Sequence, residues 1–293
     1  MNILTVVAIG LLGLVFGSFV NALVWRLHEK EAVNEERVVV AKKKDSTKKL
    51  QALDTRLQDL SITKGRSMCP ACHHTLAAKD LVPVFSWLYL RGKCRYCRAT
   101  IPDSPVVELA ATALFVLAYY AWPLGFHGVG LLEFIFCLVF IVFFVALAVY
   151  DLRWFLLPDR LVFSLVAVAA VEVVSVAIWQ HSWAAAWQPA AGALIIFGLF
   201  YGLFQVSKGV WIGGGDVKLA IALGLIVASP LRAFLVIFFA SLLGTLASLP
   251  QLGRGKQGLK THIPFGPYLL AATLIVLLSG THIVDWYVNL LAV

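Results

Sequence analysis

Apolar residues occur in blocks of about twenty, the length that carries an α-helix across the hydrocarbon core of a bilayer. The chain has 293 residues, of which only 14% are charged, whereas a soluble domain carries about 25%. The blocks therefore predict an all-α polytopic membrane protein with about eight transmembrane helices. The expected spans are residues 3–26, 105–122, 130–150, 161–179, 189–206, 216–228, 231–249 and 267–290.

The first span has no basic segment before it, so we expect it to be retained and not removed as a signal peptide. Alternating sides from this span places 23 of the 24 lysines and arginines on one face of the membrane, and only Arg232 opposite. An excess of these residues marks the cytoplasmic side. Both termini should therefore lie outside. The positive net charge follows the membrane topology and does not indicate nucleic acid.

This topology predicts three parts of the chain. We expect a first transmembrane helix at 1–27, a cytoplasmic insert at 28–104 and a seven-helix membrane core at 105–293. The insert contains leucines at helical spacing at positions 50, 53, 57 and 60, which predict one amphipathic helix. Two placements are open for its apolar face. It could lie on the anionic inner leaflet, or belong to a solvated helix that packs on the cysteine-bearing module.

The insert contains two C-x-x-C pairs, separated by twenty-one residues. Each pair can direct two thiolates at one ion, and two pairs complete a tetrahedral shell. The cytoplasm disfavours disulfides, which leaves zinc as the expected bound metal. All four positions are filled by the protein, so the zinc should be structural. The predicted ligands are Cys69, Cys72, Cys94 and Cys97.

Two aspartates stand at the predicted cytoplasmic ends of helices. Asp151 ends the third span, and Asp216 follows Gly213, Gly214 and Gly215 at the start of the sixth. Two carboxylates at one site share a proton, which suits them to activate water and protonate a leaving group. Spacing alone leaves a second interpretation open, in which Asp216 caps a helix and Asp151 merely ends one.

Further segments agree with a specific family. They are GSFVNALVWRL at 17–27, PVFSWLYLRGKCRYC at 83–97, Asp151 with LPD at 157–159, GGGDVKL at 213–219 and IPFGP at 263–267. Taken in this order, they resemble the signatures of the type IV prepilin leader peptidases, whose central motif is G-x-G-D-x-K-L. The resemblance extends over nearly the whole chain from Gly17 to Pro267, except residues 28–66.

The resemblance implies a membrane aspartyl endopeptidase of the bacterial cytoplasmic membrane. Such an enzyme removes the basic leader of type IV prepilins and pseudopilins at the cytoplasmic face, and many members then methylate the new N-terminus with S-adenosylmethionine. It implies that Asp151 and Asp216 are catalytic. By the same matching, the supporting residues would be Gly213, Gly215, Asp159 and Lys218, and the methyl-transfer candidates Gly92 and Glu108.

One segment departs from the family pattern. An Arg-Tyr pair usually precedes the proline of P-x-V-E, whereas this chain reads IPDSPVVE at 101–108. Two other functions remain as alternatives. A presenilin-like intramembrane aspartyl protease without methyltransferase activity also carries Tyr-Asp and G-x-G-D motifs, although the cysteine-bearing insert argues against it. A non-enzymatic, zinc-anchored membrane scaffold would leave Asp151 and Asp216 far apart.

Overall fold

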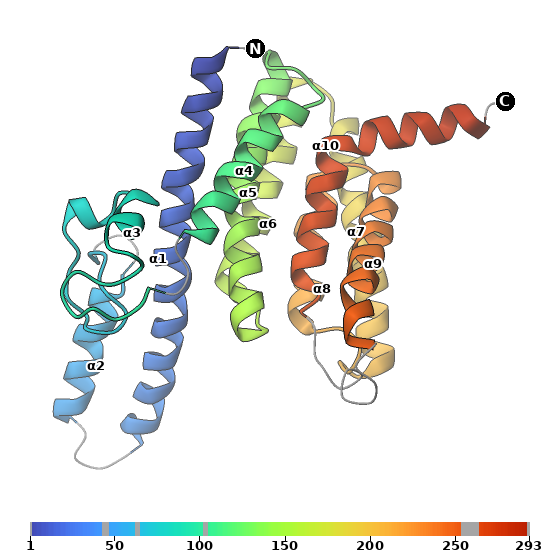
Figure 1. Ribbon diagram of the computed structural model, residues 1–293. Coiled ribbons are helices and arrows are strands. Elements are labelled where there is room, and N and C mark those ends of the chain that lie inside the picture. The colour runs from blue at the N-terminus through green and yellow to red at the C-terminus, as the bar shows by residue number, and fades with distance from the viewer. Residues whose placement is uncertain (1, 43–46, 62–64, 102–104, 253–263, 292–293) are drawn as a thin grey trace. The chain divides into compact units, whose positions relative to one another are not determined.

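The computed structural model describes residues 2–42, 47–61, 65–101, 105–252 and 264–291. The Pro102–Ser104 part of the departure from the family pattern lies outside these ranges, as do the basic residues Arg254, Lys256 and Lys260. The chain forms two compact units, Met1–Val116 and Leu117–Val293, and each is described by itself. The helices are labelled in Figure 1.

The first unit begins with α1 (Ile3–Ala41) and α2 (Thr47–Asp59), continues through the short helices η1 (Ala78–Asp80) and α3 (Phe85–Tyr89), and ends within α4 (Val106–Ala121). The second unit contains α5 (Gly128–Trp154), α6 (Asp159–Trp179), α7 (Ala184–Ser207), α8 (Gly214–Val227), α9 (Pro230–Leu252) and α10 (Gly266–Leu291).

The prediction of an all-α polytopic membrane protein is confirmed. Six helices of the described chain are long and apolar enough to cross a membrane, namely α1, α5, α6, α7, α9 and α10. The other two predicted spans are also helical but shorter, with 16 residues in α4 and 14 in α8. The count of eight is therefore approximate, although every predicted span coincides with a helix.

Close backbone contact joins α1 to α4. A Cβ atom on Gly13 would lie 2.6 Å from the Cα of Thr112, and one on Gly17 would lie 2.6 Å from the Cα of Glu108. Gly10, which precedes these glycines in α1, lies near Val116, which follows Thr112 in α4. The two helices therefore run antiparallel. Small residues four apart allow such an approach between helices in lipid, where apolar burial alone drives little association.

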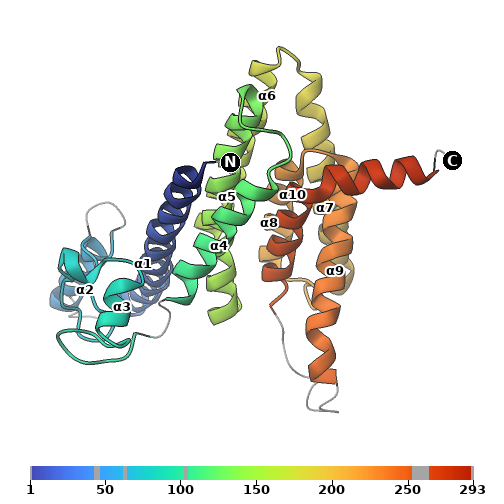
Figure 2. The ribbon, with the colours of Figure 1, turned by 45° about the horizontal axis from the view of Figure 1, so that its top comes forward.

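The helix α1 does not stop at the end of its apolar part but continues to Ala41, and α2 lies beside this extension (Figures 1 and 2). Their apolar seam consists of Val33, Val40, Leu53 and Leu60, with Trp25, Leu50 and Leu57 packed against it. The predicted amphipathic helix thus exists, but both placements expected for its apolar face were wrong. It packs on α1, because a neighbouring helix with matching valines buries Leu53 and Leu60.

Ion pairs border this helical hairpin. They are Arg37–Asp54 at 2.8 Å, Lys49–Glu36 at 3.1 Å and Arg56–Glu29. Exposed pairs contribute at most about 1 kcal/mol each, whereas each buried leucine or valine contributes about 1.5–3 kcal/mol. At its base, the buried guanidinium of Arg26 donates to the carbonyl oxygens of Ser61 and Gly65, both at 3.1 Å. The apolar seam therefore stabilises the hairpin, and Arg26 closes it.

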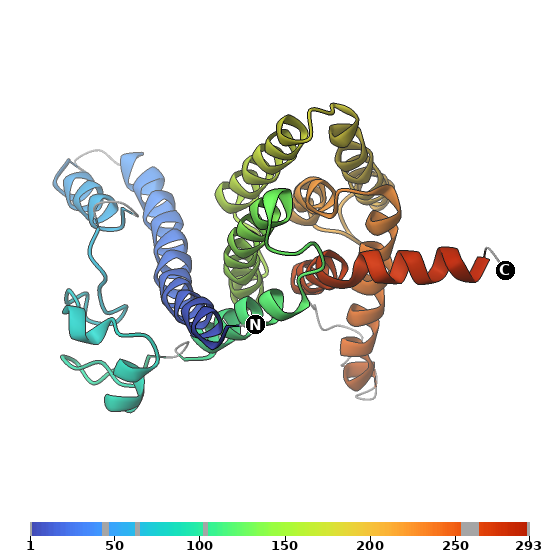
Figure 3. The same cartoon turned by 90° about the horizontal axis from the view of Figure 1, so that it is seen from above.

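In the second unit, α8 is the central helix. It packs against α6, α7, α9 and α10, and Figure 3 shows it in light orange among them. Most of its residues from Val217 to Val227 are buried. Gly224 lies directly against the backbone of Ala193 in α7, where no side chain would fit. A short, small-residue helix can occupy this position because it needs little room.

A small cavity of about 70 Å³ lies in the half of this unit where α5 begins and α8 ends. Glu133, Glu172 and Arg232 line it, and the charge of Arg232 faces that of Glu133. The one basic residue on the face opposite the others in the predicted topology therefore has acidic neighbours.

Candidate active site and metal centre

Asp151 lies in the last turn of α5. The helix ends at Phe155, which adopts a left-handed conformation and returns its N–H to the carbonyl oxygen of Asp151 at 2.8 Å. Only 5% of the Asp151 residue is exposed. A carboxylate in such surroundings is costly unless it is hydrogen-bonded or has a function.

Asp216 lies in the first turn of α8 and is half-buried. Its N–H donates to the carbonyl oxygen of Gly213 at 3.1 Å, and its carboxylate interacts with the backbone of Gly213. The Asp151 and Asp216 carboxylates are near enough for their charges to interact. Two helices that are distant in sequence thus bring their acidic ends to one place.

The turn after α5 packs against two glycines beside the aspartates. Leu157 packs against Gly215, where an added Cβ would lie 3.0 Å from the Leu157 Cβ. It also approaches Gly266, where an added Cβ would lie 3.6 Å from its Cδ2 and 2.5 Å from Oδ2 of Asp151. The backbone of Gly266 hydrogen-bonds the Asp151 carboxylate. The α5–α6 turn and the starts of α8 and α10 therefore converge on Asp151.

Gly266 was not among the predicted site residues. The sequence did contain a signal for Gly266, because this glycine belongs to the IPFGP segment. However, a glycine at the start of a helix is equally well explained as a helix cap. Only the structure shows that its missing side chain makes room for the Asp151 carboxylate.

Gly266→Ala is expected to lower about 100-fold the peptidase activity that the family resemblance implies, because a misplacement of about 1 Å at a reacting group costs that much. The added methyl group would force the Asp151 carboxylate to move. Gly202→Ala in α7 is the matched control, since nothing lies within 4 Å of its added Cβ. Cleavage rates of a protein substrate measure the difference. Equal rates for the two variants would show that Gly266 does not fix the position of Asp151.

The two other polar residues predicted to support the site contact each other. Nζ of Lys218 donates to both carboxylate oxygens of Asp159, at 2.7 and 2.9 Å. The side chains of Lys218 and Asp159 are 42% and 57% exposed. The pair joins the first turn of α6 to α8 two residues after Asp216.

The four cysteines of the insert come together as expected. Their sulfur atoms all lie within 4.8 Å of one another, and Sγ of Cys69 is 3.8 Å from Sγ of Cys97. Tetrahedral zinc with bonds of about 2.3 Å requires sulfurs about 3.8 Å apart. Burial opposes ionisation of Cys94, but backbone N–H groups of Cys97 and Tyr96 and the neighbouring thiols outweigh it and lower the pKa of Cys94 to about 7. The cluster can hold a metal ion.

Each pair of cysteines lies in the same kind of loop. In the first, the N–H of Cys69 donates to the carbonyl oxygen of His74 and the N–H of His73 to that of Cys69. In the second, Cys94 donates to Ala99 and Arg98 to Cys94. His73 and Arg98 both have positive φ, at 55° and 62°. The sequence repeats C-x-x-C-x-x-T at 69–75 and 94–100, a signal of the repeated loop that the sequence analysis missed.

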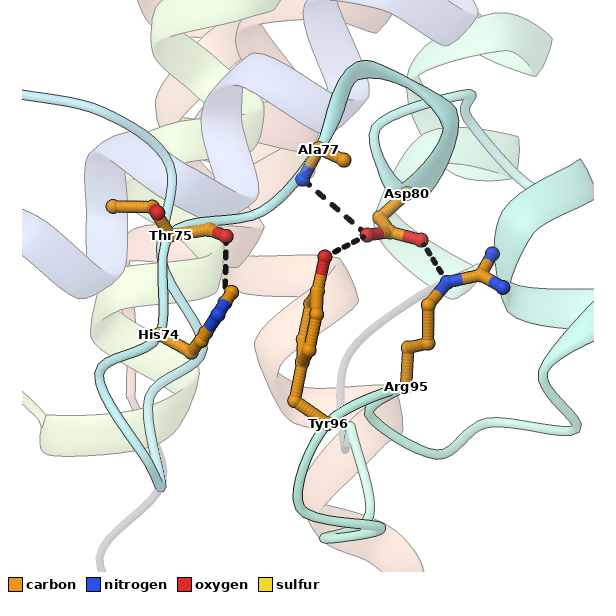
Figure 4. Close-up of polar contacts among 6 residues, drawn as sticks. All are labelled: His74, Thr75, Ala77, Asp80, Arg95 and Tyr96. Carbon is orange, nitrogen blue, oxygen red and sulfur yellow. Dashed lines mark hydrogen bonds and ion pairs between the residues drawn. The ribbon is translucent and has the colours of Figure 1, made fainter.

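Asp80 connects the two loops (Figure 4). Its carboxylate accepts from Nε of Arg95 at 2.6 Å, from the hydroxyl of Tyr96 at 3.2 Å and from the N–H of Ala77 at 3.3 Å. The rings of His74 and Tyr96 stack with centroids 3.7 Å apart. Burial acts to raise the pKa of Asp80, but the donors from Arg95 and Ala77 outweigh it and lower that pKa. Asp80 therefore stabilises the four-cysteine module as a carboxylate.

The two methyl-transfer candidates, Glu108 and Gly92, both lie next to α3. The buried carboxylate of Glu108 accepts from the N–H of Val84 at 2.5 Å, at the start of α3. Gly92 has φ of 72°, and an added Cβ would lie 3.0 Å from the indole of Trp87. Gly92 thus leaves room for an α3 side chain, and Glu108 attaches α3 to α4.

Comparison with known proteins identifies the family. Residues 11–122 match the bacterial peptidase A24 N-terminal domain, and residues 138–249 match the type IV leader peptidase family. A protein from Burkholderia pseudomallei (strain 1026b) is 33% identical over 92% of this chain and 84% of its own length. The chain belongs to the type IV leader peptidase family.

Two further relatives agree. A protein from Aeromonas salmonicida (strain A449) is 31% identical over 95% of this chain and 92% of its own length, and one from Bacillus subtilis (strain 168) is 30% identical over 79% and 88%. All three are named prepilin leader peptidase/N-methyltransferase. No solved structure matches the chain. As a type IV leader peptidase family member, the protein is a multi-pass membrane peptidase, and neither alternative function is favoured.

Proposed function

We propose that this peptidase removes the basic leader of type IV prepilins and pseudopilins, with Asp151 and Asp216 as its catalytic pair. The observation that carries this proposal is that α5 and α8 bring the two carboxylates near enough for their charges to interact. The names of the relatives supply the substrate class.

The pair can perform peptide hydrolysis without a metal in the reaction. Two neighbouring carboxylates hold one proton between them, because ionising both is costly. The ionised carboxylate takes a proton from a water molecule while the oxygen of that water attacks the scissile carbonyl carbon. The protonated carboxyl group gives its proton to the departing amide nitrogen. The C–N bond breaks, and the pair again holds one proton. Gly213 and Gly215 leave room beside Asp216 for an extended substrate.

The catalytic face should be cytoplasmic and both termini outside. Asp151 and Asp216 lie where α5 ends and α8 begins, and the predicted topology places these positions on the side rich in lysine and arginine. A leader still in the cytoplasm would reach the pair there. Cleavage should then fall between the polar leader and the apolar helix of the substrate, not within that helix.

The four-cysteine module is proposed to hold a structural zinc ion through Cys69, Cys72, Cys94 and Cys97. Thiolate ligands favour zinc, and the sulfur spacing of 3.8 Å fits it. The ion would stabilise the fold of the module. The leader is removed by the aspartates, so the zinc would affect cleavage only through that fold.

Methylation of the new N-terminus with S-adenosylmethionine is proposed as a second activity, since the relatives carry it in their names. Glu108 and Gly92 would act here by positioning α3. Purified protein in proteoliposomes is expected to shorten a prepilin by its leader, and to add one methyl group only when S-adenosylmethionine is present. Intact product masses measure both steps. An uncut prepilin would refute the peptidase proposal, and cleavage without the added mass would refute methylation alone.

A cysteine at Gly214, beside Asp216, is expected to react with a membrane-impermeant maleimide only from the cytoplasmic side of sealed vesicles. A cysteine at Trp183, which is exposed between α6 and α7, should react only from the other side. Inside-out and right-side-out vesicles give the comparison. The opposite pattern would invert the proposed orientation.

A further inference from the structure

The attachment of α3 to α4 fixes where the four-cysteine module meets the membrane. The N–H of Val84 donates to Glu108 in the first turn of α4, at 2.5 Å. The same turn lies against Gly17 of α1, where the two backbones touch. The start of α3 is therefore level with Gly17.

Gly17 lies well inside the apolar part of α1. The uncharged stretch continues beyond it to Trp25, and the first charged residue is Arg26. Nine residues of helix correspond to about 13 Å. The start of α3 thus lies on the apolar side of Arg26, at a depth where lipid or its headgroups surround the helices.

The segment Leu81–Tyr89 exposes large apolar side chains at this depth. Phe85, Leu88 and Tyr89 are 67%, 57% and 79% exposed, and their spacing of three and four residues puts them on one face of α3. Leu81 and Val82 precede them and are 41% and 45% exposed. Trp87 instead turns inward against Gly92. A patch of this kind on a soluble surface would be an association site.

Exposed basic residues border the segment. Lys79 precedes it, and Arg91 and Lys93 follow it. Cations beside an exposed aromatic face are typical of segments that lie in the interface of a membrane containing anionic lipids. Tyrosine also favours that depth, where its ring is buried and its hydroxyl hydrated.

We propose that Leu81–Tyr89 is a membrane-docking segment, whose exposed side chains insert into the leaflet in which α4 begins. It would hold the four-cysteine module against the lipid surface by contacts separate from the transmembrane helices. The partner is the bilayer itself, with Lys79, Arg91 and Lys93 facing anionic headgroups. The proposal does not depend on the peptidase mechanism.

Photo-crosslinking of the full chain tests the proposal. p-Benzoylphenylalanine is placed at Phe85 or Tyr89, and the protein is reconstituted in vesicles of phosphatidylethanolamine and phosphatidylglycerol. Phe19, which is 45% exposed on α1, is the control for lipid contact. Gln58, which is exposed on α2, is the control for water. Mass spectrometry after illumination should find lipid adducts at positions 85 and 89 in yields like those at Phe19, and none at Gln58.

Metal content equal to that of the unmodified protein shows that the module has folded in each variant. Lipid adducts at Phe19 but none at positions 85 and 89 would overturn the proposal. Crosslinks from 85 and 89 to protein in place of lipid would also overturn it, and would identify the patch as a protein interface. As a second readout, Phe85→Ser with Tyr89→Ser should lose protection of Arg91 and Lys93 from trypsin in vesicles, and unchanged protection would contradict docking.

Discussion

Asp151→Asn and Asp216→Asn are each expected to lower leader cleavage by at least about 10³-fold, the scale of general acid–base catalysis by a placed side chain. Asparagine keeps the size of aspartate and its ability to accept hydrogen bonds, but it cannot take up or release the proton. Both carboxylates are needed because one activates water while the other protonates the leaving group. Cleavage of a prepilin, followed by intact mass, measures the loss.

Two acidic controls accompany these variants. Asp159→Asn breaks the exposed pair with Lys218, so it should retain part of the activity, since such pairs contribute at most about 1 kcal/mol. Asp285→Asn changes an exposed residue of α10 and should cleave normally. If Asp151→Asn or Asp216→Asn cleaved at the rate of the unmodified protein, an aspartyl mechanism at this pair would be excluded. If Asp159→Asn were inactive, the catalytic residue of the upstream segment would be misassigned.

Cys94→Ser is expected to lose bound metal and to unfold the four-cysteine module, because structural zinc supplies about 10 kcal/mol or more of folding free energy to small sites. Cys94 is 2% exposed, so the serine also leaves an unmatched polar group inside the cluster. Elemental analysis should find about one zinc per unmodified chain and none in the variant. Limited proteolysis of residues 65–101 should show the loss of structure.

Cys137→Ser is the matched control for the metal. Cys137 is a buried cysteine of α5 and does not belong to the cluster, so its replacement should leave metal content unchanged. Active protein that contains no zinc would refute the assignment. Zinc that remains bound after Cys94→Ser would show that the four thiols are not its ligands.

The membrane helices could be predicted from the sequence because hydrophobic length is a local property. The metal cluster was predictable as well, since cysteine spacing directly limits which ions the thiols can hold. The region of residues 28–60 was harder, because Leu53 and Leu60 only show that a face is apolar. They do not show that Val33 and Val40, on an extension of α1, would cover it.

The surroundings of the candidate aspartates were predictable only in part. Motifs pointed to Asp151 and Asp216 themselves, because those residue types carry the chemistry. Gly266 and Leu157 escaped notice because their contribution is shape, and shape depends on contacts between α5, α8 and α10. The pairing of Lys218 with Asp159 likewise joins residues 59 positions apart, beyond any local pattern.

The closure of the hairpin by Arg26 has a consequence for how this part of the chain can change. Because Arg26 binds the carbonyl oxygens of Ser61 and Gly65, the two ends of the segment 26–65 lie close together. The segment between these two ends is a hairpin that is closed by the hydrogen bonds of Arg26. Lengthening or shortening it by matched helical turns would leave the membrane entry of α1 and the four-cysteine module where they are. A fluorescent tag inserted between α1 and α2 is therefore expected to leave the four-cysteine module folded.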